Sequence, residues 1–103
     1  MTDPPALSPE QRAVALERAA EARRVRAEVR RALGSGETGL AEVLEQAHDD
    51  LIGGIKVKAL LTALPGLGKV KSRRLMEQLG ISENRRLRGL GIRQKRALLD
   101  ALG

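Results

Sequence analysis

Apolar residues in the first third of the chain are sparse and helically spaced. Ser8-Pro9-Glu10-Gln11 is typical of a helix start, with Ser8 as N-cap, Pro9 at the first helical position and Gln11 completing a capping box. Gly34-Ser35-Gly36 predicts the helix end, which gives a long helix over 8–33. Its second half carries a stripe that should dock on the core: Ala22, Val25, Val29 and Leu33. The Ala-rich first half, 12–21, has little to bury, so we expect it to project or fray.

From residue 40 onward, short apolar runs alternate with glycine breaks. Helical spacing predicts helices over 38–47, 57–64, 69–79 and 92–102, with a turn or short helix over 82–86. There are 17 Leu and 14 Ala against ten Val and Ile together, which favours helices over strands. The prediction is an all-α fold in which a long N-terminal helix joins a small helical body over 40–102. We expect a flexible tail over 1–7 and a single domain over 8–103.

One internal repeat stands out in the C-terminal part. Leu64–Leu79 can be laid on Leu87–Leu102, 23 residues later, with seven identities in sixteen positions. Each copy is Leu-x-Gly-Leu-Gly followed by a basic amphipathic helix. The first N–H groups of a helix lack partners and attract anions, and glycine lets a phosphate approach them. A lone Gly-x-Gly is more often a tight turn, but two at the same offset beside several cations favour two phosphate sites built alike.

Charge is split unevenly between the two halves. Residues 1–50 carry a net charge of −3 and residues 51–103 carry +9, within a total of +6. A half this basic indicates a polyanionic partner. The chain has no Phe, Trp, Tyr or Cys and one histidine, His48. These absences exclude disulfides, thiolate zinc sites, a histidine triad and aromatic stacking of unpaired bases.

Neither a membrane span nor a secretory signal is indicated. No apolar run approaches the roughly 18 residues that a span needs, and the first 30 residues are charged throughout. We therefore expect a cytoplasmic monomer with no cofactor, no metal, no membrane and no small-molecule substrate.

Two weaker features each have two interpretations. Arg23, Arg26 and Arg30 share a helix face and could lie along nucleic acid, but local pairs such as Glu21–Arg24 and Glu28–Arg31 are slightly favoured. Pro65 and Leu67 could form an apolar wedge at a base step, although turn chemistry explains Pro65 equally well.

Two runs carry a specific family resemblance. "LSPEQRAVALERAAEARRVRAEVRRAL" and "IKVKALLTALPGLGKVKSRRLMEQLGISENRRLRGLGIRQKRALLDAL" resemble the actinobacterial integration host factor family, most distinctively in "ALPGLGKVK" and "RRLRGLG". The resemblance implies a small helical body with a helix-two-turn-helix element, similar to one in a small-subunit ribosomal protein and in certain DNA repair glycosylases. It also implies a nucleoid-associated protein that binds and bends duplex DNA with weak sequence preference. Effects on DNA topology, replication and phage site-specific integration would follow.

The resemblance places DNA contacts in two segments, 64–71 and 82–94. Arg85, Arg86 and Arg88 are expected to be the most exposed of these residues. Together with neighbouring cations, the candidate DNA-binding residues are Leu64, Pro65, Gly66, Leu67, Gly68, Lys69, Val70, Lys71, Ser72, Arg73, Arg74, Ser82, Asn84, Arg85, Arg86, Arg88, Gly89, Leu90, Gly91, Arg93 and Gln94.

The sequence features favour one of three classes of function over the other two. A DNA-binding architectural protein fits the charge split, the paired loops and the resemblance. A structured-RNA or ribosome-binding module is the alternative, because the same phosphate sites would serve an RNA helix. An enzyme is not expected, because residue 2 is Thr rather than an N-terminal proline nucleophile and no carboxylate–lysine pair is recognisable.

Overall fold

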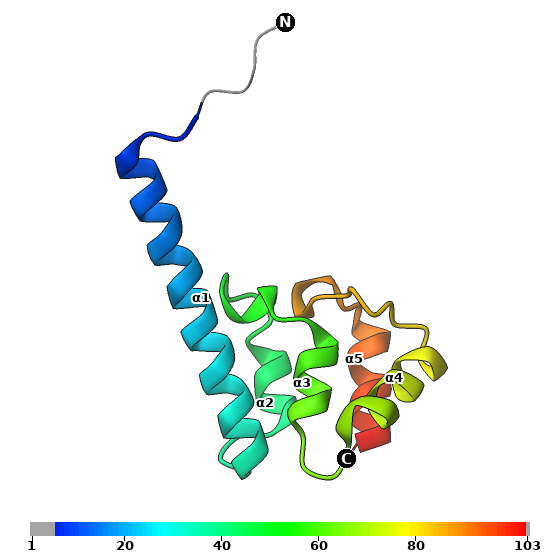
Figure 1. The fold of residues 1–103 in the computed structure, drawn as a ribbon. Coiled ribbons are helices and arrows are strands. Elements are labelled where there is room, and N and C mark those ends of the chain that lie inside the picture. The colour runs from blue at the N-terminus through cyan, green and yellow to red at the C-terminus, as the bar shows by residue number, and fades with distance from the viewer. Residues whose placement is uncertain (1–5, 103) are drawn as a thin grey trace, which may run out of the picture.

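The computed structural model describes residues 6–102, and the fold is all-helical over this range, as predicted (Figure 1). Of the tail expected over 1–7, residues 1–5 lie outside the described part. Among residues 6–102, no helix combines the length and apolar character needed to cross a membrane. In chain order the elements are α1 (Pro9–Ser35), α2 (Leu40–Glu45), η1 (Ile52–Gly54), α3 (Val57–Ala63), α4 (Gly68–Gln78), η2 (Leu87–Gly89) and α5 (Ile92–Leu102).

Helix α1 begins and ends with the expected local signals. The Ser8 hydroxyl accepts the Gln11 N–H at 3.1 Å, and the Gln11 side chain accepts the Ser8 N–H at 2.9 Å. Gly36 ends the helix in a left-handed conformation with φ 79°. The C-terminal half packs against α3, whereas the N-terminal half rises clear of the body (Figure 1). The Cα radius of gyration is accordingly 16.2 Å, against about 13 Å for a compact chain of this length.

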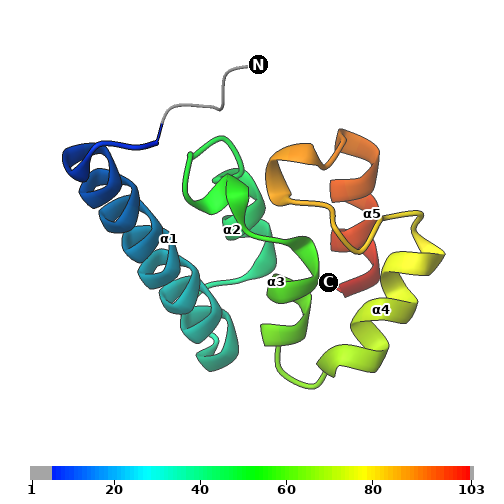
Figure 2. The same cartoon turned by 45° about the horizontal axis from the view of Figure 1, so that its top comes forward.

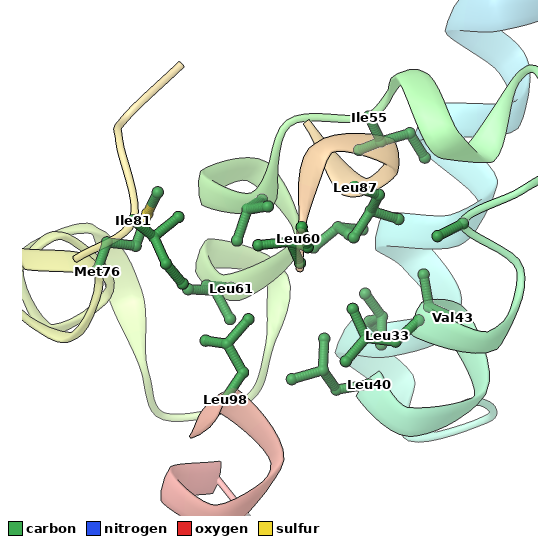
Figure 3. Packing of buried hydrophobic residues seen from close by; sticks show 14 residues of the cluster. Leu33, Leu40, Val43, Ile55, Leu60, Leu61, Met76, Ile81, Leu87 and Leu98 are labelled. Carbon is green, nitrogen blue, oxygen red and sulfur yellow. The ribbon is translucent and has the colours of Figure 1, made fainter. Parts of the chain in front are cut away.

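The core is centred on α3, which lies between α1 and α4 (Figure 2). Leu60 and Leu61 are fully buried on α3. Leu33 and Val43 approach them from one side and Met76 and Ile81 from the other, with Leu87 and Leu98 completing the cluster (Figure 3). On α5, Leu98 is buried and Leu99 and Leu102 are partly buried against the cluster. The body therefore has one contiguous core.

Two distant segments are joined by backbone hydrogen bonds. The Val57 N–H donates to the Arg85 carbonyl and the Leu87 N–H donates to the Ile55 carbonyl, both at 3.0 Å. Lys56 and Arg86 form an isolated antiparallel bridge between these bonds. The arginine-rich loop between α4 and α5 is thereby fixed against the start of α3 and beside η1.

One predicted helix is shorter in the structure than expected. The helix expected over 38–47 covers only Leu40–Glu45, because Gly39 is the N-cap and Thr38 lies before it, donating to the Glu42 carboxylate at 2.7 Å. Its C-terminal end tightens into a turn through the Ala47 N–H and the Leu44 carbonyl. Residues 82–86 form a turn, which is one of the two forms expected for them. The remaining helices begin within one residue of their expected starts.

Candidate nucleic-acid interface

The three arginines of the α4–α5 loop are held by backbone carbonyl groups. Arg88 donates from Nε to the Gly53 carbonyl at 3.3 Å and from Nη2 to the Asp50 carbonyl at 3.1 Å. Arg86 donates to the Gly54 carbonyl, and Arg85 donates to the Gly89 carbonyl at 3.1 Å. All three residues are exposed. A guanidinium has five N–H groups, so each retains donors for an external anion while its position is restrained.

These arginines form one end of a continuous cationic surface that includes α1. A hollow of about 400 Å³ is lined by Arg23, Arg26, Arg30 and Lys56, with Ala27 and Ala59 as its small apolar residues. Arg26 also lines the adjoining hollow, which extends to Arg86 and Arg88. A third hollow includes Arg85, Arg86 and Arg88. We call this surface the arginine trough and define it by Arg23, Arg26, Arg30, Lys56, Arg85, Arg86 and Arg88.

The trough cations have no carboxylate partners among residues 6–102, although Asp50 lines the middle hollow. The ion pairs of the described chain lie elsewhere. Arg31 contacts Glu28 and Glu37 at 2.7 Å each, and Glu83 is shared by Arg73 at 3.4 Å and Lys58 at 3.9 Å. The predicted Glu28–Arg31 pair is thus confirmed, whereas Glu21 and Arg24 form no ion pair in this range. A surface of cations without acidic partners attracts a polyanion.

Three carboxylates have a lowered pKa. Hydrogen bonds from Arg31 lower the pKa of Glu28 and of Glu37. Hydrogen bonds from the Ile52 and Leu51 N–H groups lower the pKa of Asp49. The Asp49 carboxylate thereby anchors the turn that leads into η1, on which the Arg88 contacts depend.

The first glycine loop has the open geometry that an anion site requires. Pro65 and Gly66 are the central residues of a turn closed by the Leu67 N–H and the Leu64 carbonyl at 3.3 Å. Gly66 and Gly68 have φ 78° and 71°, which side chains other than glycine rarely adopt. No side chain caps the N-terminus of α4, and Lys69 and Lys71 are exposed in its first turn. The N–H groups of this helix start are therefore accessible to a phosphate.

The second glycine loop is built differently, so the prediction of one element made twice is wrong. Gly89 and Gly91 have no left-handed φ, and the helix starts one position later in the repeat. The Gly91 N–H is already bound by the Gln94 side chain at 3.2 Å, and Gln94 also donates to the Gly80 carbonyl at 3.4 Å. Arg88 occupies the position that Pro65 has in the first copy. The residue before it, Leu87, donates its N–H to the Ile55 carbonyl, whereas its counterpart in the first copy ends a helix.

The candidate DNA-binding residues differ in how exposed their side chains are. Ser72 is fully buried and donates to the Gly68 carbonyl, and Leu90 is 7% exposed, so neither side chain is available to DNA; this corrects the sequence prediction. Leu67 is partly buried against the core, which removes it as a wedge. Leu64 and Gln94 are half-buried. The other candidates are exposed: Pro65, Gly66, Gly68, Lys69, Val70, Lys71, Arg73, Arg74, Ser82, Asn84, Arg85, Arg86, Arg88, Gly89, Gly91 and Arg93.

The two candidate segments lie at opposite ends of the body. The turn between α3 and α4 is at the bottom of both ribbon views and the orange loop before α5 is at the top (Figures 1 and 2). Sequence reasoning did not join Arg23, Arg26, Arg30 and Lys56 to the second segment. The signal was present as three arginines on one helix face, but the residues that complete the trough are 26 or more positions away in sequence.

Comparison with known proteins identifies first the class and then the family. Residues 33–102 match the S13-like H2TH domain family, so the body is a helix-two-turn-helix domain. Relatives named integration host factor are 54% identical in Mycobacterium tuberculosis (96% of this chain, 95% of that protein) and 56% identical in Streptomyces coelicolor (96% and 94%). The relative of the same name in Mycolicibacterium smegmatis is 55% identical (93% and 92%). The chain belongs to the actinobacterial integration host factor family.

One solved structure is also similar. It is described as sIHF bound to an 8-bp palindromic DNA, and it is 51% identical in sequence to this chain. The TM-score is 0.82, and the match covers 84% of this chain and 99% of that chain.

Proposed function

We propose that this protein is a nucleoid-associated architectural protein that binds and bends duplex DNA with little sequence preference. The arginine trough carries the proposal, because it collects seven cations without an ion-paired carboxylate along one surface. The names of its relatives and the DNA-bound neighbour support it. Contacts to phosphates position a protein on DNA without specifying sequence, in keeping with a weak preference.

The binding mechanism rests on prepositioned donors. Carbonyl groups of residues 50, 53, 54 and 89 restrain the guanidinium groups of Arg85, Arg86 and Arg88, so little side-chain freedom remains to be lost on binding. Each free N–H edge can donate a charge-assisted hydrogen bond to a phosphate oxygen. The α4 start supplies a second anion site at the other end of the body.

Contacts at two separated ends can also stabilise a bend. A deflection of 40–90° costs on the order of 1–6 kcal/mol, which additional phosphate contacts must offset. A duplex that curves from the trough towards the 64–71 loop would gain those contacts. The proposal extends to effects on DNA topology, replication and phage site-specific integration, which bending by a member of this family would produce.

Fluorescence anisotropy on a labelled 25-bp duplex at several salt concentrations tests the proposal. Neutralising six to eight phosphates gives a log–log salt slope of roughly −5 to −7. We expect this slope for the duplex, with little change when its sequence is scrambled. A slope near zero would contradict phosphate binding, and the corresponding single strand serves as the control without A- or B-form geometry.

Structured RNA is the alternative partner, favoured by the match to an S13-like domain. An RNA hairpin measured beside the duplex separates the two, since the same arginines would serve either helix. Preference for the hairpin would mean that the shared fold does not bring a shared partner.

Glu83 provides a prediction about the charge balance of the interface. Its carboxylate is 54% exposed and contacts both Lys58 and Arg73. Glu83→Gln would free two cations, so we expect duplex affinity to rise about two- to fivefold, with stability changed by less than about 1 kcal/mol. Glu77→Gln on α4 is the matched control, because Glu77 forms no ion pair among residues 6–102. Equal effects of the two substitutions would show that only net charge matters.

A further inference from the structure

Two exposed aliphatic side chains mark the starts of the helices that follow the glycine loops. Within residues 40–102, the exposed large hydrophobic residues are Val70, at 62% exposure, and Ile92, at 83%. Val70 lies in the first turn of α4 between Lys69 and Lys71, and Ile92 is the first residue of α5, next to Arg93. Single exposed aliphatic residues are common on protein surfaces. Their recurrence at both loops, each beside cations, is the observation that requires an explanation.

The surroundings of Ile92 permit close approach of another molecule. A Cβ on Gly91 would meet nothing within 4 Å, and Gly91 has no left-handed φ. Neither packing nor backbone conformation within the described chain therefore requires glycine there. The situation differs at Gly89, two residues before Gly91. A Cβ on Gly89 would be 3.1 Å from the Arg85 side chain, which lies against this glycine. Ile92 thus follows an unobstructed glycine in the chain, with the Arg85 side chain against Gly89, three residues before it, and exposed Arg93 directly after it.

We infer that Ile92 is an apolar wedge that enters a base step of the bent duplex. This inference rests on the proposed DNA binding and assigns one residue to the bend. Architectural proteins insert Ile, Leu, Met, Phe or Pro between bases from the minor groove, and the partial unstacking kinks the duplex. The cations beside Ile92 would hold the flanking phosphates, and Gly91 would let the sugar–phosphate backbone pass close to the helix start. Leu67, which the sequence analysis considered for this role, is packed against the core.

Ile92→Ser tests the wedge by separating bending from charge. The probe is a 25-bp duplex with a fluorophore pair at its ends for energy transfer, and a second version carries 2-aminopurine to report unstacking. We expect the variant to lose the protein-induced rise in energy transfer and in 2-aminopurine fluorescence. It should also bind the duplex about tenfold more weakly, because the aliphatic side chain that would be buried between bases is gone. The salt slope should stay unchanged, because no charge is altered.

Two further variants control the experiment. Val14→Ser removes an aliphatic residue that is 48% exposed on the projecting half of α1, and it should bend the duplex as the parent protein does. Ile92→Leu keeps an aliphatic group and should restore both signals. Because Ile92 is 83% exposed, its variants should have the melting temperature of the parent.

The outcomes distinguish the wedge from the proposed function. If the parent protein binds and bends the duplex and Ile92→Ser produces the same energy transfer and 2-aminopurine signal, the wedge is wrong. Weaker binding by Ile92→Ser with unchanged signals would also overturn it, since that result describes a contact without insertion. If the parent protein does not bind the duplex at all, the proposed function itself fails.

Discussion

Replacing Arg23, Arg26 and Arg30 together by glutamine is expected to remove most duplex binding and leave the fold intact. The three guanidinium groups line one hollow of the arginine trough and donate no hydrogen bond within residues 6–102. Loss of three phosphate contacts would reduce the magnitude of the salt slope by about 2 to 3, and affinity at moderate salt should fall on the order of 100-fold. Anisotropy titrations at several salt concentrations measure both quantities, and thermal unfolding should be unchanged.

A second triple variant with the same charge change is the control for this prediction. Arg12, Arg18 and Arg24 are on the same helix but do not line the trough. Glutamine at these three positions should weaken binding much less. If both triple variants lose affinity equally, α1 contributes only net charge and the trough is not a binding surface.

Substitutions of the arginines in the α4–α5 loop cannot separate an effect on DNA binding from an effect on stability. Arg86 and Arg88 bind carbonyl groups of the η1 segment, more than 30 residues away in sequence. Alanine at Arg85, Arg86 and Arg88 would remove phosphate donors and also release buried or half-buried carbonyl groups of that segment. We expect this variant to lose affinity and stability together, so the α1 variant is the sharper test of binding.

Gly53→Ala is expected to produce the largest loss of stability at a position beside the trough. Gly53 is buried, and a Cβ there would collide with the Ala47 carbonyl oxygen and approach Arg88. Backbone atoms must move, at a cost of about 2–4 kcal/mol. For a domain of this size the melting temperature should fall on the order of 10–20 °C. Calorimetry or circular dichroism measures the shift.

Loss of DNA binding should accompany that loss of stability. The displaced segment carries the carbonyl groups that hold Arg86 and Arg88, so duplex affinity should fall even at temperatures where the variant is folded. Gly39→Ala is the matched control, because a Cβ there meets nothing within 4 Å and its φ of −108° suits alanine. A Gly53→Ala protein with the stability of the Gly39→Ala protein would contradict the steric assignment.

Local features of the fold could be predicted from the sequence. The Ser8 capping box, the turn at Pro65 and Gly66, and the helices after residues 56, 67 and 91 all depend on contacts within a few residues. Hydrophobic spacing and caps act over one or two helical turns, so such elements are encoded where they form. The charge split and the absence of aromatic residues likewise follow from composition alone.

The two copies of the internal repeat nevertheless fold differently, because residues far away in the sequence contact the second copy. Gly66 and Gly89 occupy matching positions in the repeat, yet only Gly66 is left-handed. Leu87, just before the second loop, donates its N–H to the Ile55 carbonyl, which lies outside the repeat. The Gly91 N–H donates to the Gln94 side chain, a residue that the first copy does not share. These contacts set the backbone of the second loop. The pattern of charges around Ser72 likewise did not show that its side chain is buried.

The sequence by itself determined the all-helical class, the family, the helix ends and the basic character of the C-terminal half, because these depend on neighbouring residues or on composition. Only the tertiary structure decided which cations share a surface. Arg26 lines one hollow with Arg86 and Arg88, and the next hollow with Arg23 and Arg30, because α1 packs on α3 while the 85–87 segment pairs with 55–57. Those contacts join segments that lie far apart in the sequence, and no local pattern brings them together.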